Sequence, residues 1–254
     1  MQNDKSLGQH WLKNRAILEE IATLAAEGST GRTCLEIGPG LGTLTSSLLK
    51  RFDKVIAVEF DERLAANLPG SFPGTNLEVI NEDILDFDYS RVEGAYTVAG
   101  NIPYYITSPI IERVLLAEHV PERVVLLIQK EVAERIVSTR ETLLSLRVKN
   151  RADVELGPVV LKEEFTPPPK VDSQVIILKP HPPIVNDKVL KLMNIAFSSP
   201  RKKVTRNLMG LVSRDELKME FVRMNINIDV RPGELHLADW QRVYDAVKKI
   251  VGKQ

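Results

Sequence analysis

Short apolar runs that alternate with helical stretches limit what this chain of 254 residues can fold into. Five runs rich in apolar and β-branched residues predict strands, at residues 33–37, 54–60, 77–80, 95–99 and 123–129. Several of them are apolar throughout, which indicates burial on both faces and is typical of parallel sheets. The pattern therefore predicts an α/β fold, in which a parallel sheet carries helices on both faces.

The second half of the chain has a different pattern of predicted secondary structure. "KEVAERIV" predicts a helix, and residues 152–180 read as β segments around a Pro-rich loop, which we expect to finish the same sheet as antiparallel strands. "KPHPP" at 179–183 interrupts regular structure because its prolines fix φ and lack a donor. The later stretches have helical spacing. We therefore predict two domains, 1–180 and an all-helical 181–254.

Charge is distributed unevenly along the chain. Lys plus Arg and Asp plus Glu both total 34, but the part from His181 onward carries 14 Lys and Arg against 8 Asp and Glu. This asymmetry favours a nucleic-acid surface near the C-terminus, with a solvated helical face as the alternative.

Cysteine, histidine and hydropathy patterns predict several absences. Cys34 is the only cysteine, so no disulfide can form within the chain. The four histidines and this cysteine lack zinc-site spacing. No signal peptide or membrane-length apolar run is present. We expect a cytoplasmic monomer without a metal or a membrane anchor.

A glycine-rich turn follows the first predicted strand. In "LEIGPGLG" the glycines Gly38, Gly40 and Gly42 let backbone approach a ligand and direct a helix N-terminus at it. Glu59, at the end of the second strand, can accept from both hydroxyls of a ribose. Asp83, just after the third strand, is placed to accept from an adenine amino group. NAD and S-adenosylmethionine both carry these groups.

The stretch "NIPYY" distinguishes between these two cofactors. The lone pair of an adenine amine is delocalised into the ring, so acceptors must raise its nucleophilicity. The Asn101 side-chain oxygen and the Ile102 carbonyl can take the two amine hydrogens, Pro103 stiffens the turn, and Tyr104 offers a flat face for the base. These residues predict adenine-amine methylation, with an ordinary turn as the alternative.

An extruded base is held on both faces, so a second aromatic residue is expected. Phe165, in the Pro-stiffened loop "FTPPPKVDS", is the candidate, and core packing is its alternative.

Several motifs in order resemble the ribosomal RNA adenine dimethyltransferases of the KsgA type. The resemblance covers nearly the whole chain and rests on "KSLGQHWL", "LEIGPGLGTLT", "AVEFD", "NIPYYITSPII", "QKEVAERI", "FTPPPKVDS", "AFSSPRKKVTRNL" and "DVRPGELHLADW". It implies a Rossmann-like class I methyltransferase domain with a helical C-terminal domain, and S-adenosylmethionine as donor. It further implies dimethylation of two adjacent adenines near the 3′ end of small-subunit rRNA, during biogenesis of that subunit.

The resemblance also implies site residues and shows two departures. The cofactor contacts fall on His10, Leu12, Gly38, Glu59, Asp83 and Asn101, beside the glycine-loop residue Gly40. The family usually has Asn where His10 stands. After "QKEVAERI" it usually has a Gly/Lys stretch and a Tyr-Gly pair, whereas this chain has "VSTRETLLSLRVKN" at 137–150.

Two other functions compete with this interpretation. One is a large-subunit adenine methyltransferase of the macrolide-resistance type, which shares the "NIPY" region. The other is a non-catalytic RNA-binding assembly or transcription factor, in which damage to the glycine loop or to "NIPY" would be expected, and both are intact. In the C-terminal part, we expect RNA phosphates to contact Arg201, Lys202, Lys203 and Arg206.

Overall fold

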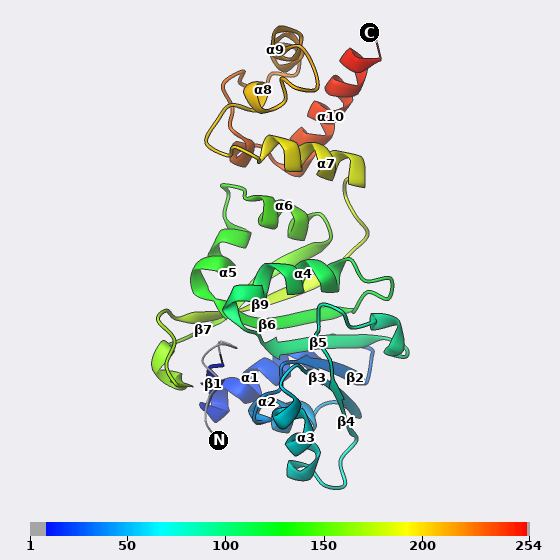
Figure 1. Cartoon of the computed structure of the whole chain (residues 1–254), viewed down its shortest axis with the longest axis vertical. Coiled ribbons are helices and arrows are strands. Elements are labelled where there is room, and N and C mark those ends of the chain that lie inside the picture. Colours follow the sequence, from blue (N-terminus) through cyan, green and yellow to red (C-terminus); the bar gives the residue numbers. More distant parts are fainter. Residues whose placement is uncertain (1–8, 253–254) are drawn as a thin grey trace. The chain divides into compact units, whose positions relative to one another are not determined.

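A mostly parallel seven-stranded sheet forms the centre of the N-terminal part of the protein (Figure 1), with the strand order β4-β3-β2-β5-β6-β9-β7. The structure is a computed structural model that describes residues 9–252. Strands β2 to β6 are mutually parallel, and β9 runs antiparallel to both β6 and β7. The strands are β2 Thr33–Ile37, β3 Lys54–Glu59, β4 Leu77–Asn81, β5 Tyr96–Asn101, β6 Arg123–Gln129, β7 Ala152–Val160 and β9 Ser173–Pro180. The predicted α/β fold is confirmed.

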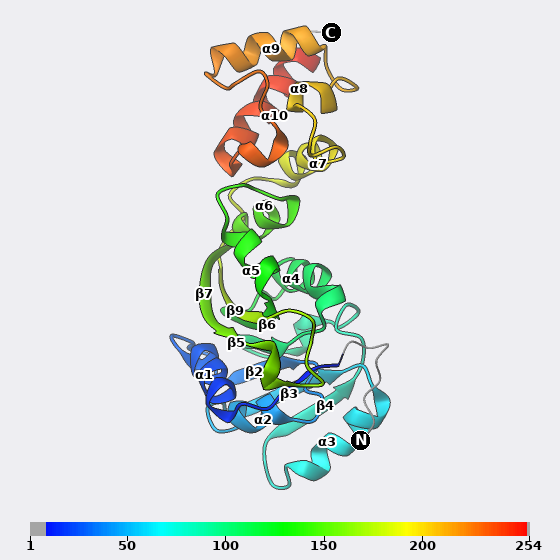
Figure 2. The same cartoon turned by 90° about the vertical axis from the view of Figure 1, so that its left-hand side faces the viewer.

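Helices cover both faces of the sheet. Figure 2 shows α1 and α4 on opposite sides of it. On the α1 side, α1 and α2 share one apolar cluster with alternate residues of the strands, among them Cys34, Val55 and Val125. Asn14 starts α1 by accepting from the backbone N–H groups of Ala16 and Ile17. The helices of this part are α1 Arg15–Ala26, α2 Thr43–Leu48, α3 Glu62–Ser71, α4 Thr107–Leu115 and α5 Lys130–Val137.

The carboxyl ends of the parallel strands meet at one edge of the sheet. In the register, Ile37 of β2 lies opposite Val58 of β3 and opposite Gly100 of β5. Gly38, Glu59 and Asn101 therefore follow or end neighbouring strands at the same level. This is the edge at which open α/β sheets bind ligands.

A small second sheet joins two segments that are far apart in the sequence. β1 (Trp11–Leu12) pairs antiparallel with β8 (Phe165–Thr166), and Leu12 lies opposite Phe165. The Lys13 N–H donates to the Glu164 carbonyl at 3.0 Å and extends this pairing. The pairing brings His10, which precedes β1, close to Pro167, which follows β8.

The chain divides into two compact units, and the division differs from the predicted single boundary. One unit contains the described residues up to Glu134 together with Ala152–His181, and the other contains 135–151 together with the residues from Pro182 onward. The second unit is helical. Its complete helices are α6 Leu143–Lys149, α7 Asp187–Ala196, α8 Val204–Asn207, α9 Arg214–Arg223 and α10 Leu237–Val251.

Residues 135–151 belong to the helical unit because their buried partners lie there. Leu146 is part of the apolar core that surrounds Trp240 and Phe221. The Asn150 side chain accepts from the Val185 N–H at 2.7 Å and donates to the Val185 carbonyl at 3.2 Å. The atypical stretch 137–150 thus contributes a helix to this unit.

A buried carboxylate strengthens this attachment. Glu141 accepts from Lys149 Nζ at 2.9 Å and Ser145 Oγ at 2.7 Å, and its Oε1 lies 3.1 Å from His236 Nδ1. The Glu141 backbone N–H donates to the Gly233 carbonyl at 2.8 Å. Buried charges need such partners. Lys149 and Ser145 are close to Glu141 in the sequence, whereas His236 comes from a distant part of the chain.

Neither a membrane span nor a metal cluster is found in residues 9–252. No helix in this range is long and apolar enough to cross a membrane. The same range holds no group of three or more His, Cys, Asp or Glu side chains arranged to bind a metal ion.

Candidate active site

The glycine loop makes a tight turn between β2 and α2. Gly38, Gly40 and Gly42 all have positive φ, at 64°, 58° and 80°. A Cβ on Gly42 would lie 2.7 Å from the Leu68 side chain, so glycine is required there for space as well as for conformation. The Gly38 N–H donates to the Val58 carbonyl, which ties the loop to β3.

Glu59 fixes this loop with its carboxylate. It ends β3, is 7% exposed, and accepts from the Gly40 N–H at 3.0 Å and from the Asp61 N–H at 2.9 Å. Burial raises the pKa of Glu59, while these backbone donors oppose the rise. Each carboxylate oxygen has a second acceptor position, so Glu59 can hold the loop and bind hydroxyl groups at the same time.

Asp83 lies two residues beyond the end of β4. Its Oδ1 accepts from the Leu85 N–H at 2.9 Å, which holds the carboxylate in place in the turn after the strand. The second oxygen is available to a ligand amino group.

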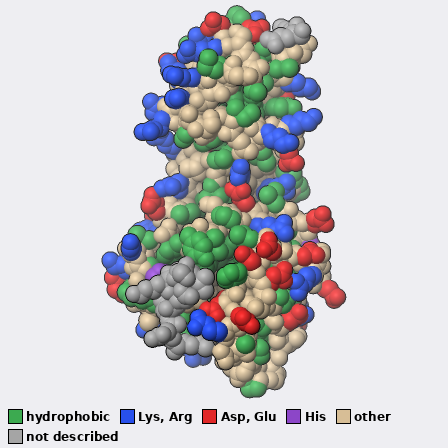
Figure 3. Space-filling view, viewed as in Figure 1, with side chains coloured by type: hydrophobic (Ala, Val, Ile, Leu, Met, Phe, Trp, Pro, Cys, Tyr) green, Lys and Arg blue, Asp and Glu red, His purple; other side chains and the backbone are tan. Residues whose placement is uncertain are grey.

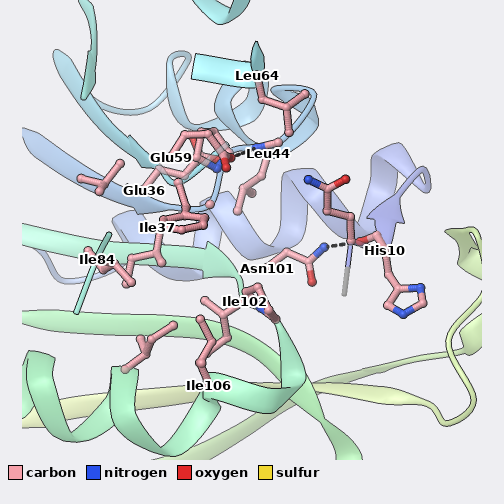
Figure 4. Close-up of a pocket in the computed structure, with 18 of the residues that line it drawn as sticks. His10, Glu36, Ile37, Leu44, Glu59, Leu64, Ile84, Asn101, Ile102 and Ile106 are labelled. Carbon is pink, nitrogen blue, oxygen red and sulfur yellow. Dashed lines mark hydrogen bonds between the residues drawn. The ribbon is translucent and has the colours of Figure 1, made fainter. Parts of the chain in front are cut away.

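Asn101 is oriented by a long-range hydrogen bond. Its Nδ2 donates to the His10 carbonyl at 2.9 Å (Figure 4), which identifies the nitrogen end of the amide. The Oδ1 atom is therefore the end that remains to accept from a substrate. Asn101 is the last residue of β5, so the sheet itself positions this acceptor.

Tyr104 is held next to Asn101 by its hydroxyl. The Tyr104 Oη lies 2.6 Å from Ser173 Oγ, at the start of β9. Burial raises the pKa of Tyr104, so its phenol is neutral. Its neighbour Tyr105 is 63% exposed.

These residues line a single pocket within the first unit, which contains about 1240 Å³ of space including its open mouth. Figure 4 shows Glu36 and Glu59 from one side of this pocket and Asn101 and Ile102 from another. The structure brings together all the predicted cofactor and catalytic residues except one. These lining residues are His10, Leu12, Gly38, Gly40, Glu59, Asp83, Asn101, Ile102, Pro103 and Tyr104.

The exception is Phe165, which was predicted as the second stacking residue. It is 2% exposed and belongs to the apolar cluster beneath α1 and α2. Pairing of β8 with β1 turns Phe165 into that core beside Leu12. The prediction that Phe165 offers a face to the substrate is therefore wrong for this structure, and its alternative of core packing is correct.

Two pocket residues were missed by the sequence interpretation. Trp11 packs on the glycine loop, where a Cβ on Gly40 would lie 3.1 Å from its Nε1. Glu36 is 1% exposed, and its Oε2 has no hydrogen-bond partner among the described residues. An acidic residue inside the apolar run "TCLEI" was the available signal for Glu36.

Glu36 is expected to make stability depend on pH. Burial, with a contribution from the nearby Glu59 charge, raises the pKa of Glu36 to about 8 from its ordinary value of 4.5. Between these values the unfolded chain has released this proton and the folded protein still holds it, so rising pH lowers the free energy of unfolding. Glu36→Gln cannot titrate. Its free energy of unfolding relative to wild type should therefore increase by about 1.4 kcal/mol from pH 6 to pH 7.

Denaturant titrations at the two pH values measure this difference. The exposed Glu62→Gln variant is the control, and its difference from wild type should be the same at both pH values. A Glu36→Gln difference that also stays constant would show that Glu36 is ionised in the folded protein.

Comparisons with known proteins find relatives along the whole chain. The family model described as "Ribosomal RNA adenine dimethylase" matches residues 1–249. A "Ribosomal RNA small subunit methyltransferase A" from Acaryochloris marina is 39% identical over 96% of both chains. The protein of the same name from Synechococcus elongatus is 38% identical and covers 93% of this chain and 92% of its own.

Solved structures are also similar to this chain over most of its length. A dimethyladenosine transferase from Plasmodium falciparum has a TM-score of 0.76 at 26% identity, over 94% of this chain and 97% of its own. The 23S rRNA methyltransferase ErmE has a TM-score of 0.75 at 25% identity, over 94% of this chain and 99% of its own.

Proposed function

The chain belongs to the ribosomal RNA adenine dimethylase family, and on that premise we propose that it dimethylates two adjacent adenines near the 3′ end of small-subunit rRNA. The reaction contributes to small-subunit biogenesis in the cytoplasm. S-adenosylmethionine is the methyl donor. The observation that carries the proposal is the oriented Asn101 amide, which shares one pocket with Glu59 and Asp83.

The pocket suits this donor because its polar groups match the donor's parts. Glu59 would hold the ribose hydroxyls, Asp83 the adenine amino group, and the loop at Gly38 and Gly40 would lie against the methionine portion. Among the described residues, the Glu36 Oε2 on the pocket wall has no hydrogen-bond partner, and a hydroxyl-bearing ligand can supply one. When bound, S-adenosylmethionine supplies an electrophilic methyl group.

Asn101 and its neighbours prepare the nucleophile. The Asn101 oxygen and the Ile102 carbonyl accept the two hydrogens of the adenine amine, which draws the nitrogen lone pair out of the ring. Tyr104 supports one face of the base. The donor would supply its methyl group by in-line displacement, in which the bond from carbon to the sulfonium sulfur breaks as the bond to the adenine nitrogen forms and the amine releases one proton. We propose that this needs neither a metal ion nor a covalent intermediate, and we expect the enzyme to act as a monomer.

Two alternatives are less well supported. A large-subunit substrate is suggested by ErmE, but that protein is 25% identical whereas the small-subunit methyltransferases are 38–39% identical. A non-catalytic RNA-binding factor would not need the complete pocket that the structure retains. The small-subunit enzyme is therefore the proposed function.

Methylation of purified ribosomal subunits tests the proposal. Small and large subunits from cells that lack the gene would be incubated with the protein and S-adenosylmethionine carrying a radioactive methyl group. We expect label in the small subunit only, and primer extension should stop at two adjacent adenines. Label confined to the large subunit would establish the first alternative, and no label in either would favour the second.

The C-terminal basic residues are proposed to bind rRNA phosphates. Arg201, Lys202 and Arg206 are exposed, whereas Lys203 forms an ion pair with Asp229 at 2.6 Å. Figure 3 shows many Lys and Arg side chains over the helical unit. Replacing the three exposed residues with alanine should weaken small-subunit binding and reduce the slope of log affinity against log salt by about 2, because each lost phosphate contact removes about 0.7–0.9.

The matched control changes the same number of charges elsewhere in the same unit. Arg214, Lys218 and Arg223 of α9 would be replaced together with alanine, and their salt slope should stay near the wild-type value. If both triple variants keep the wild-type slope, the basic residues form only a solvated face.

A further inference from the structure

The aromatic ring that lies against Tyr104 is the imidazole of His10. The two ring centroids are 5.9 Å apart and the ring planes are inclined by only 22°. Within residues 9–252, this is the one ring that stacks on Tyr104. We infer that His10 forms the second wall of the adenine site, opposite Tyr104. This inference rests on the proposed function.

Among the described residues, no other aromatic ring stacks on Tyr104 to form the second wall. A base taken out of its stack is held on both faces, and Tyr104 supplies only one. Phe165 cannot supply the other because it is buried in the core. The His10 ring already lies against the face of Tyr104 on which the base would stack. The family usually has the non-aromatic Asn at this position.

The backbone of His10 is placed by two independent contacts. It precedes β1, whose pairing with β8 anchors this segment to the strand before Pro167. Its carbonyl accepts from Asn101 Nδ2 at 2.9 Å. One hydrogen bond therefore links Asn101, the proposed amine acceptor, to His10, the proposed second wall. The two residues share the same edge of the pocket.

The imidazole is turned away from the cofactor side of the pocket. Figure 4 shows the ring pointing away from Glu36 and Glu59, which mark the cofactor side. The His10 Nδ1 lies 2.8 Å from the Pro167 carbonyl. A carbonyl only accepts, so Nδ1 carries the proton and this bond fixes the ring plane.

The space between the rings is close to that needed for a base. Stacked rings are separated by about 3.5 Å, so a base between two rings needs them about 7 Å apart. The observed centroid distance of 5.9 Å is shorter by about 1 Å. To admit an adenine the two rings must therefore move apart by about 1 Å, and without RNA they shield each other.

Substitutions at His10 test this inference in the full-length protein. The variants His10→Ala, His10→Phe and His10→Asn would be compared with wild type and with Tyr104→Ala on unmethylated small subunits. Three quantities would be measured: the apparent affinity for the subunits, the single-turnover methylation rate, and the calorimetric affinity for S-adenosylmethionine. Thermal unfolding would verify that each variant is folded.

We expect His10→Ala and His10→Asn to lower the apparent affinity for small subunits at least about fivefold, the size of the weakest base-stacking effects. Their affinity for S-adenosylmethionine should change less than about twofold, because the Asn101 contact uses the His10 backbone. His10→Phe keeps a flat face and should restore most of the loss. The loss in a His10→Ala/Tyr104→Ala double variant should be smaller than the sum of the two losses, since both rings hold the same base.

Three results would overturn the inference while the proposed function stands. They are wild-type behaviour of His10→Ala, an equal loss in His10→Ala and His10→Phe, and a loss of S-adenosylmethionine affinity in His10→Ala as large as the loss in methylation. The last would assign His10 to the cofactor, as the family resemblance implies. If the wild-type protein leaves small-subunit adenines unmethylated, both the proposed function and this inference are wrong.

Discussion

Asn101→Ala should lower the single-turnover rate of adenine methylation on the order of 10²–10³-fold, the loss seen when one oriented hydrogen-bonding group is removed from a polar transition state. The amide oxygen accepts more strongly as charge develops on the adenine nitrogen, so its loss acts mainly on the chemical step. Rapid-quench measurements with excess enzyme report this step directly. Binding of S-adenosylmethionine should also weaken somewhat, because the family resemblance places this Asn beside the methionine portion.

Asn67→Ala is the matched control for this experiment. Asn67 is an exposed amide of α3 that is not among the residues lining the pocket, so this variant should keep a rate near wild type. A wild-type rate in Asn101→Ala would mean that the strand end is only a turn, and that the proposed chemistry of the adenine amine is wrong.

If Glu59 holds the ribose as proposed, Glu59→Ala should weaken S-adenosylmethionine binding about a hundredfold, since it would remove two charge-assisted hydrogen bonds worth about 1.5 kcal/mol each. Glu59 also holds Gly40 and Asp61 through their N–H groups, so the glycine loop loses its anchor in the same variant. Isothermal titration calorimetry measures the affinity. The exposed Glu62→Ala variant removes a carboxylate three residues away and should bind normally.

Glu59→Gln separates the two roles of this side chain. The amide keeps one oxygen, which can accept from only one of the Gly40 and Asp61 N–H groups, so the loop keeps part of its anchor, but the side chain has no charge for the ribose hydroxyls. We expect an affinity between those of wild type and Glu59→Ala. Unchanged affinity in Glu59→Ala would remove the ribose assignment.

The sheet and most of the pocket could be predicted because their signals are local. The parallel strands are runs rich in apolar residues, and the pocket residues Gly38, Glu59 and Asn101 follow or end such runs. Parallel strands bring their carboxyl ends together, so the positions of these residues in the sequence were enough to place them at one edge. Glu36 had an equally local signal, as a carboxylate within an apolar run.

The predictions that were wrong or missing concern site residues and the domain division, and these depend on contacts between residues that are distant in the sequence. Nothing in "EFTPPP" shows that Phe165 lies opposite Leu12, and this pairing is what buries Phe165. Likewise, the contact between His10 and Tyr104 is created by the β1 and β8 pairing rather than by either local sequence. The assignment of residues 135–151 to the helical unit depends on Leu146, whose neighbours come from the last third of the chain.

The helical unit is built from two separate pieces of chain, and this affects how it can be made. Residues 135–151 leave the ribosome first, and Val185, Gly233 and His236, which complete the surroundings of Asn150 and Glu141, are synthesised only after β7 and β9. The nascent unit must wait, with Leu146 uncovered and Glu141 without its Gly233 and His236 partners, while the other unit receives its last strands. A single cut at His181 therefore cannot yield an intact helical fragment, whereas a direct fusion of residues 135–151 to the residues from Pro182 onward could.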